Sequence, residues 1–267
     1  MKKIALFAAV LLMCACTREP RLVIIHVNDT HSHLEPERGG DLSGHGGVIE
    51  RAAFVDSVRS AMGEDRVMLV HAGDFNQGSS YFSQFGGDLE IELVNALGYD
   101  CITLGNHEFD NGIEDLERRF ESLKCPVVCA NLDLSPFKGL DCVKPYTILE
   151  KGGMKIGVIG LEADITGCVS KLTSSRIPQL DPVEVTNKWS AYLNDVEKCD
   201  FVMLLSHQGY EEDHAIAAAS RGLDLIIGGH THTRVDGIDY VRDLDKKKVP
   251  IVTDWCWGLE CGEVRIY

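Results

Sequence analysis

Five short apolar segments of this chain each end in a cluster of histidine, aspartate or asparagine. The clearest is Cys101–Leu104, which is followed by Gly105-Asn106-His107-Glu108-Phe109-Asp110 and then by a helix-like segment, Ile113 to Leu123. The other four apolar segments are Val23–Ile25, Met68–Val70, Phe201–Leu205 and Leu225–Ile227. Short continuous apolar runs are typical of strands that are buried on both faces. The pattern predicts an α/β domain whose polar clusters lie at the carboxyl ends of its strands.

The segments between these strands have the spacing and end signals of helices. A helix over Asp88–Leu97 is closed by Gly98, and Asp181-Pro182 begins another that runs to about Glu197. Further helices are predicted over Val48–Met62 and Glu211–Ser220, a short strand over Val127–Ala130, a hairpin over Tyr146–Glu150 and Lys155–Leu161, and closing β segments over Pro250–Asp254 and Glu263–Tyr267. No repeat or linker divides the chain, which predicts one domain that becomes more antiparallel toward its end.

Composition limits the partners of this chain. The 267 residues are 45% hydrophobic, which is ample for a packed core. With 41 acidic and 26 basic residues the formal charge is −15, which argues against nucleic-acid binding because phosphate backbones require a basic surface. A small anionic substrate would have to be held by metal ions or by a local patch.

The first 16 residues are similar to a bacterial lipoprotein signal. Lys2-Lys3 precede an apolar segment, Ile4 to Met13, that is too short for a comfortable membrane span, and Ala15 precedes Cys16. We expect an exported protein with a lipid on Cys16, anchored in a membrane and facing the periplasm or the cell surface. The alternative is an ordinary secretory signal that is cleaved near Ala15.

Cysteine usage leaves the covalent structure open. Eight cysteines follow Cys16, and an even number in an exported chain permits disulfide bonds without specifying their pairing. Their spacing does not match a structural zinc site. Several adjoin apolar segments and are equally well explained as buried thiols.

The polar clusters supply the ligands of a two-metal centre. The candidates are Asp29, His31, Asp74, Asn106, His207, His230 and His232. Asp74 is the candidate bridge, because only an anionic oxygen ligand can serve both cations and offset their repulsion. Imidazole and carboxylate without thiolate favour zinc, manganese, iron or cobalt over calcium or magnesium. His230 and His232, two residues apart in a predicted extended segment, should point the same way.

Each motif also has a structural explanation. Asp29 could be a turn residue, Asp74 could cap the next segment, and Asn106 could stabilise a tight turn. Chance is nevertheless an improbable explanation for ligand-type residues at five strand ends, and this pattern favours one shared site. The remaining histidines are predicted to be structural or surface groups, namely His26, His33, His45, His71 and His214.

Together the motifs resemble the five sequence blocks of the calcineurin-like metallophosphoesterases. These are Asn28-Asp29-x-His31, Gly73-Asp74, Gly105-Asn106-His107-Glu108, Ser206-His207 and Gly229-His230-x-His232. Residues 28–34 and 105–110 are similar to the exported 5′-nucleotidase branch, which includes UDP-sugar hydrolases and 2′,3′-cyclic phosphodiesterases. The resemblance covers nearly all of residues 21–267. It implies a catalytic domain over residues 17–267 with a four-layer αββα fold, in which two mixed sheets are flanked by helices.

The resemblance also implies a role for each site residue. One metal would be held by Asp29, His31, Asp74 and His232, and the other by Asp74, Asn106, His207 and His230. His107 would stabilise charge on the phosphoryl oxygens and would be oriented by Asp110. An alternative or additional role for Asp110 is the N-cap of the next helix.

The implied function is that of an exported phosphoesterase in which a metal-bridging hydroxide attacks the phosphorus of nucleotides or related small molecules. Members of this branch usually continue into a C-terminal domain that binds the nucleoside, whereas this sequence ends at Tyr267. We therefore expect a separate chain to supply that domain. The alternatives are the same core acting by itself on another phosphate or sulfur ester, or a non-catalytic binding lipoprotein.

Overall fold

The computed structural model describes residues 19–267, which form two six-stranded sheets. The predicted signal and lipidation site, residues 1–16, lie outside the described residues. The first sheet has the order β12 (Gly262–Ile266), β1 (Leu22–Val27), β2 (Val67–His71), β3 (Cys101–Thr103), β4 (Val127–Val128) and β5 (Val143–Lys144). The second has the order β10 (Asp239–Arg242), β11 (Lys248–Val252), β9 (Leu225–Ile227), β8 (Phe201–His207), β7 (Met154–Glu162) and β6 (Tyr146–Lys151).

Both sheets are parallel in the middle and antiparallel at one or both edges. β1, β2 and β3 are parallel neighbours, as are β7, β8 and β9. β12, β10 and β6 pair antiparallel with β1, β11 and β7, respectively. The predicted 146–161 hairpin is therefore confirmed. The late chain is more antiparallel, as predicted, but only at the sheet edges, because β7, β8, β9 and β11 are parallel neighbours.

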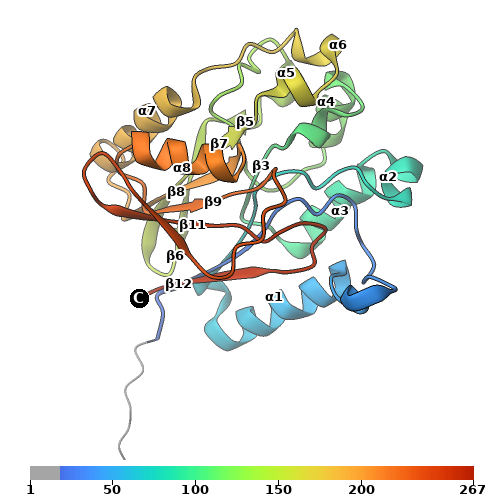
Figure 1. Cartoon of the computed structure of the whole chain (residues 1–267), viewed down its shortest axis with the longest axis horizontal. Coiled ribbons are helices and arrows are strands. Elements are labelled where there is room, and N and C mark those ends of the chain that lie inside the picture. Colours follow the sequence, from blue (N-terminus) through green and yellow to red (C-terminus); the bar gives the residue numbers. More distant parts are fainter. Residues whose placement is uncertain (1–18) are drawn as a thin grey trace, which may run out of the picture.

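Helices cover the outer face of each sheet. On the first sheet these are α1 (Val48–Met62), α3 (Asp88–Leu97) and α4 (Ile113–Phe120), and on the second they are α7 (Pro182–Asp195) and α8 (Tyr210–Ala219). In Figure 1, α1 lies on one side of the molecule and α7 and α8 lie on the other, with the strands between them. This is the four-layer sandwich that the family resemblance implied.

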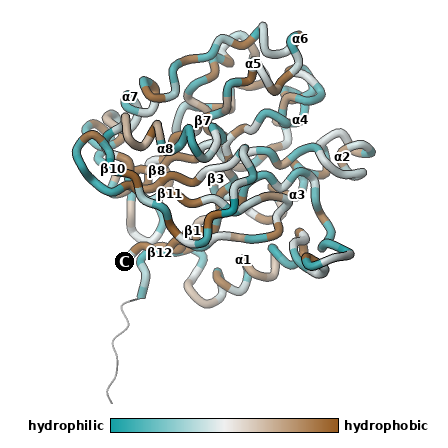
Figure 2. Tube along the Cα trace, viewed as in Figure 1, coloured by the Kyte–Doolittle hydropathy of each residue, from teal (hydrophilic) through white to brown (hydrophobic). Residues whose placement is uncertain are grey.

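The strands are apolar along their whole length because both of their faces are buried. In β1, Val23 and Ile25 pack toward the helices, whereas Leu22 and Ile24 pack between the two sheets. All four side chains are fully buried. Figure 2 shows this distribution along the chain, with hydrophobic segments concentrated at the strands and hydrophilic segments in the outer loops. Burial on two faces thus explains the continuous apolar runs in the sequence.

Most helix limits follow the end signals in the sequence, and several short elements do not. Asp181 caps α7 by accepting a hydrogen bond from the N–H of Glu184, and Pro182 is its first residue. The helix that begins at Ile113 ends at Phe120, earlier than predicted. The elements that were not predicted are α2 (Ser80–Phe85), α5 (Ile165–Cys168), α6 (Lys171–Ser174), β5, β10 and four 3-10 turns (Gly40–Leu42, Glu64–Arg66, Asn106–Phe109 and Lys138–Leu140). These elements are short, with too few residues to produce a periodic pattern.

The eight cysteines from Cys101 onward are all free thiols, so no disulfide bond crosslinks the described part of the chain. Within residues 19–267 no helix combines the length and the apolar character that a membrane span requires.

Candidate metal centre

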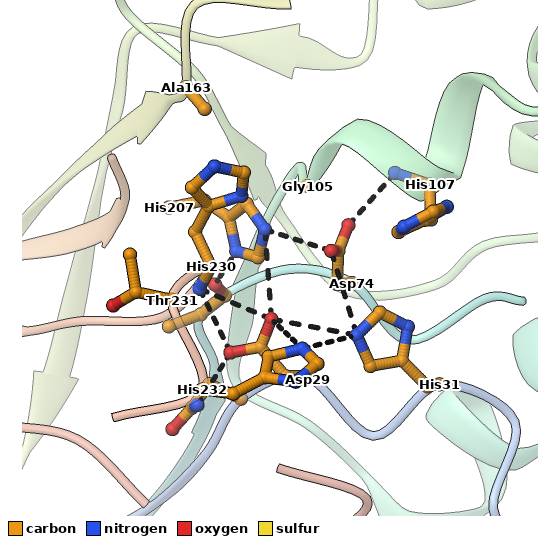
Figure 3. Close-up of polar contacts among 12 residues, drawn as sticks. Asp29, His31, Asp74, Gly105, His107, Ala163, His207, His230, Thr231 and His232 are labelled. Carbon is orange, nitrogen blue, oxygen red and sulfur yellow. Dashed lines mark hydrogen bonds and ion pairs between the residues drawn. The ribbon is translucent and has the colours of Figure 1, made fainter. Parts of the chain in front are cut away.

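The carboxyl ends of the central strands of both sheets meet, and the polar clusters lie there. The loops after β1, β2 and β3 carry residues 28–33, 72–77 and 104–109, and the second sheet adds the end of β8 and the loop after β9. Figure 3 shows the side chains of Asp29, His31, Asp74 and His207 turned toward one another. The strand-end arrangement predicted from the sequence is therefore present.

One group of ligand-type atoms consists of Asp29, His31 and His232. Their ligand atoms lie within 4.8 Å of one another. His31 Nε2 lies 2.8 Å from His232 Nε2 and 3.8 Å from Asp29 Oδ1, and His232 Nε2 lies 3.5 Å from Asp29 Oδ1. Two ring nitrogens this close, facing a carboxylate, require a proton or a cation among them.

A second group consists of Asp74, His207 and His230, whose ligand atoms also lie within 4.8 Å of one another. His207 Nε2 lies 3.1 Å from Asp74 Oδ2, which is itself 3.8 Å from His31 Nε2. Asp74 Oδ2 is thus placed between the two groups. Asp29 Oδ1 occupies a comparable position, because it lies 3.8 Å from His207 Nε2.

Two buried polar atoms at this centre have no hydrogen-bond partner. They are Asn106 Oδ1 and His207 Nε2, and the latter has only its ion-pair contacts with Asp74 Oδ2 and Asp29 Oδ1. Asn106 is 4% exposed and His207 is fully buried, so solvent does not satisfy these atoms. A buried acceptor without a partner costs free energy, about 1–3 kcal/mol for a neutral group. A cation bound between the two groups would remove that cost, and the oxygen and nitrogen donors present suit one.

In His207 and His31, the ring nitrogen Nδ1 forms a hydrogen bond with a backbone carbonyl group. The Nδ1 of His207 lies 2.7 Å from the carbonyl oxygen of Ala72, and that of His31 lies 3.2 Å from the carbonyl oxygen of Asn76. Because a carbonyl oxygen only accepts, each Nδ1 carries a proton, and each Nε2 faces the centre, where its lone pair could bind a cation in place of a second proton. Sequence reasoning could not identify these acceptors, since they are backbone atoms of distant residues.

The Glu108 carboxylate joins two of the loops. It is fully buried and accepts hydrogen bonds from four backbone N–H groups, those of Asp74 (2.9 Å), Phe75 (3.1 Å), Asn76 (3.2 Å) and Gly105 (2.6 Å). The N–H of His107 in turn donates to Asp74 Oδ1 at 2.9 Å, which leaves Oδ2 facing the centre. Glu108 belongs to the motif at residues 105–110, and the motif alone predicts no role for it.

Five of the seven predicted ligands have a left-handed backbone. The φ angles are 49° at Asp29, 46° at His31, 56° at Asp74, 78° at His230 and 51° at His232. Such angles are uncommon for residues other than glycine and cluster at functional sites. The prediction that His230 and His232 lie in an extended segment and point the same way is wrong, because these turns send the two rings to different groups.

Burial and mutual contact change the pKa values within the centre. Burial lowers the pKa of His31 and of His230, which favours the neutral, ligating form of both rings. Burial alone would raise the pKa of Asp74, but the adjacent His207 holds it below its usual range. Conversely, Asp74 and Asp29 outweigh the burial of His207 and raise its pKa well above normal. The buried carboxylates of Asp29 and Asp74 therefore stabilise positive charge in the centre.

His107 and Asp110 form a pair beside the centre. His107 Nδ1 lies 2.8 Å from Asp110 Oδ2, and this hydrogen bond raises the pKa of His107. The ligand atoms of His107 also lie within 4.8 Å of those of His31 and Asp74. The alternative that Asp110 is the N-cap of the next helix is wrong, because Gly112 occupies that position.

Of the five histidines predicted to be structural or surface groups, His33 lines the cavity of the centre. His26 pairs with Asp254 at 2.7 Å, His71 with Thr30 at 3.0 Å and His214 with Asp239 at 2.9 Å, while His45 is exposed. His33 stacks on Trp257, and its Nδ1 lies 3.4 Å from Glu37 Oε1. The cavity is about 370 Å³ and is lined by His31, His33, Asp74, Gln77, Gly78, Asn106, His107, His230, His232 and Trp257.

Comparison with known proteins reveals extensive similarity. The family model of the calcineurin-like phosphoesterases matches residues 22–234. The chain is 34% identical over 267 residues to a probable 5′-nucleotidase of Treponema pallidum (strain Nichols), covering 92% of this chain and 44% of that protein. It is 32% identical to a 5′-nucleotidase of Homo sapiens, covering 92% and 46%, respectively.

A solved structure is similar in both fold and sequence. The 5′-nucleotidase precursor from Thermus thermophilus superposes with a TM-score of 0.84 at 34% identity, covering 91% of this chain and 51% of that one. The chain thus spans about half the length of these relatives.

The contacts of Glu108 predict that it supports metal binding. Glu108→Gln replaces one acceptor oxygen by an NH₂ group that faces two backbone N–H donors, so two of the four hydrogen bonds are lost. We expect the affinity for Zn²⁺ or Mn²⁺ to fall about 10- to 100-fold, as for other groups that orient metal ligands. Isothermal titration of the metal-free protein measures this. The exposed Glu121→Gln is the matched control, and equal affinities in the two variants would contradict the prediction.

Proposed function

The chain belongs to the calcineurin-like phosphoesterase family, as a 5′-nucleotidase-like domain, and on that basis we propose that it hydrolyses phosphate esters of nucleotides or related small molecules at a centre of two divalent metal ions. The observation that carries the proposal is the convergence of carboxylates and imidazoles from both sheets on one cavity. An enzyme explains this convergence better than a scaffold does, because a scaffold has no need for buried polar atoms without partners.

We assign the seven ligands to two positions that share Asp74. Asp29, His31 and His232 would hold one cation, and Asn106, His207 and His230 would hold the other. The position of Asp74 Oδ2, 3.1 Å from His207 Nε2 and 3.8 Å from His31 Nε2, supports its bridging role. When bound, two such cations would lower the pKa of a water molecule and neutralise charge on the substrate phosphate. Zinc, manganese, iron and cobalt all suit this donor set.

His107 is assigned to the substrate rather than to a metal ion. Its backbone N–H orients Asp74, and its ring is one-quarter exposed and lines the cavity. The Asp110 carboxylate accepts a hydrogen bond from His107 Nδ1–H, so Nε2 is free to face a ligand. As a hydrogen-bond donor, His107 would stabilise the negative charge that develops on the phosphoryl oxygens.

Asp74→Ala tests the metal centre. We expect less metal per chain and hydrolysis of an aryl phosphate reduced by more than about 100-fold, because loss of a direct ligand should exceed the 10- to 100-fold cost of losing a supporting group. Metal analysis and steady-state kinetics measure both effects, with the exposed Asp41→Ala as control. Wild-type activity should disappear with a chelator and return with Mn²⁺ or Zn²⁺. A metal-loaded wild type without phosphatase activity would favour the scaffold alternative.

His107→Ala separates the two possible uses of this ring. If His107 acts on the substrate, kcat should fall about 10²- to 10³-fold while metal content stays at the wild-type value. Asp110→Asn should reduce kcat less, because the ring remains but is less well oriented. His214→Ala is the matched control, since His214 on α8 forms a similar pair with Asp239 on β10. A fall in metal content in His107→Ala would instead identify His107 as a ligand.

We also propose export and lipid anchoring through Cys16. The support is the order of Lys2-Lys3, the apolar segment from Ile4 to Met13, and Ala15 before Cys16. In a bacterial host, the wild type should incorporate a labelled fatty acid and partition into the membrane fraction, whereas Cys16→Ala should do neither. Cys14→Ala is the control and should behave as the wild type. Secretion of an unlabelled wild-type protein would support the ordinary secretory signal.

A further inference from the structure

An aromatic pair forms one wall of the cavity that holds the candidate metal centre. The rings of His33 and Trp257 stack with their centroids 4.9 Å apart and an interplanar angle of 8°. Both rings line the cavity together with Asn106, His107 and His230. A flat apolar surface therefore lies beside a polar floor of carboxylates and imidazoles.

Trp257 keeps much of its surface exposed despite the stack. The residue is 38% exposed, among the large hydrophobic residues that lie outside the core, and the side chain of His33 is 24% exposed. Trp255, two residues earlier, has the guanidinium of Arg234 over its ring at 5.3 Å. Each ring of the His33–Trp257 pair contacts the other ring through one face, so its second face is not part of the stack. An exposed indole in a cavity offers a large, rigid contact area for a ligand.

Backbone hydrogen bonds tie both rings to the segment that carries the ligands Asp29 and His31. The N–H of Trp257 donates to the carbonyl oxygen of Asp29 at 2.6 Å, and the N–H of His33 donates to that of Thr30 at 2.9 Å. Trp257 has a φ of 60°, an uncommon angle for so large a residue. The backbones of both residues are therefore held near the metal centre, and the stack orients their rings.

We propose that His33 and Trp257 form a stacking surface for a planar ring within the leaving group of the substrate, the base of a nucleoside or another aromatic ring. This inference rests on the proposed function, because it places the phosphate of the same substrate at the metal centre. The cavity volume of about 370 Å³ suits a small molecule and lies within the usual range for ligand sites. Stacking tolerates different ring systems, since each presents a π face.

The test compares two ligands that the enzyme cannot hydrolyse, a nucleoside 5′-phosphonate and the corresponding sugar phosphonate without the base. Their Kd values are measured by titration calorimetry with the Mn²⁺-loaded protein. The wild type should bind the nucleoside phosphonate about tenfold more tightly. In Trp257→Ala this ratio should fall to about one, and in Trp257→Phe, which keeps a flat ring, it should stay well above one. His33→Ala should lower the ratio less than Trp257→Ala does.

Tyr240→Ala is the matched control, because Tyr240 is an aromatic residue, 51% exposed, that does not line the cavity. Its ratio should equal that of the wild type. A ratio near one in the wild type, a ratio unchanged in Trp257→Ala, or no binding of either phosphonate would overturn the stacking surface. Neither ligand is hydrolysed, so base preference without phosphatase activity would contradict only the proposed function. Activity without base preference would contradict only the stacking surface.

Discussion

Two buried carboxylates, those of Asp29 and Asp74, impose the main physical constraint on this molecule. An ionised carboxylate removed from water is costly unless charge and hydrogen bonds replace the lost solvent. Around Asp29 these are the N–H of His230 and the side-chain amide of Asn28. The surrounding imidazoles supply the remaining positive charge as protons, as the raised pKa of His207 indicates. A pair of divalent cations would replace those protons and serve the same carboxylates.

The loops around Asp74 approach so closely that glycine is required. A Cβ at Gly105 would lie 2.3 Å from the backbone nitrogen of Asp74, and one at Gly73 would lie 2.6 Å from His207 Nδ1 and from the carbonyl oxygen of Leu104. Real Cβ atoms do not come this close to other atoms, so larger residues would push the loops apart. Glu108 then holds the same two loops together through backbone N–H groups. The hydrogen bonds of the buried Glu108 thus offset the strain of the left-handed backbone at Asp74.

The cavity has two chemically different surfaces, and this difference suggests how a substrate would be oriented. The floor is formed by buried carboxylate and imidazole groups, whereas the wall of His33 and Trp257 is aromatic and partly exposed. Asn28 connects the two surfaces, because its side chain bonds both to the Asp29 carboxylate and to the carbonyl oxygen of Trp255. A phosphate ester with an aromatic leaving group has the same division between a charged end and a flat apolar end. This match is the basis of the proposed stacking surface.

The class of fold and the edge at which the site lies could both be predicted from the order of the residues. Apolar runs such as Val23–Ile25 identify strands covered on both faces, and parallel strands bring their carboxyl ends to one edge, so ligand-type residues after each strand had to meet. The limits of α1, α3 and β9 also follow from local signals, because capping and periodicity act within a few residues. Local signals do not extend to contacts between distant segments.

How the side chains divide between the two groups, and what holds them, depends on the folded domain. His230 and His232 separate because their backbone is left-handed, a conformation that the residue types do not encode. The acceptors of the ring protons and the donors to Glu108 are backbone groups, which look alike in any sequence. His33 and Trp257 are far apart in the chain. They stack because a backbone hydrogen bond from Trp257 to Asp29 joins the loop before β12 to the loop after β1. Such contacts depend on the packing of the whole domain, so a single sequence cannot reveal them.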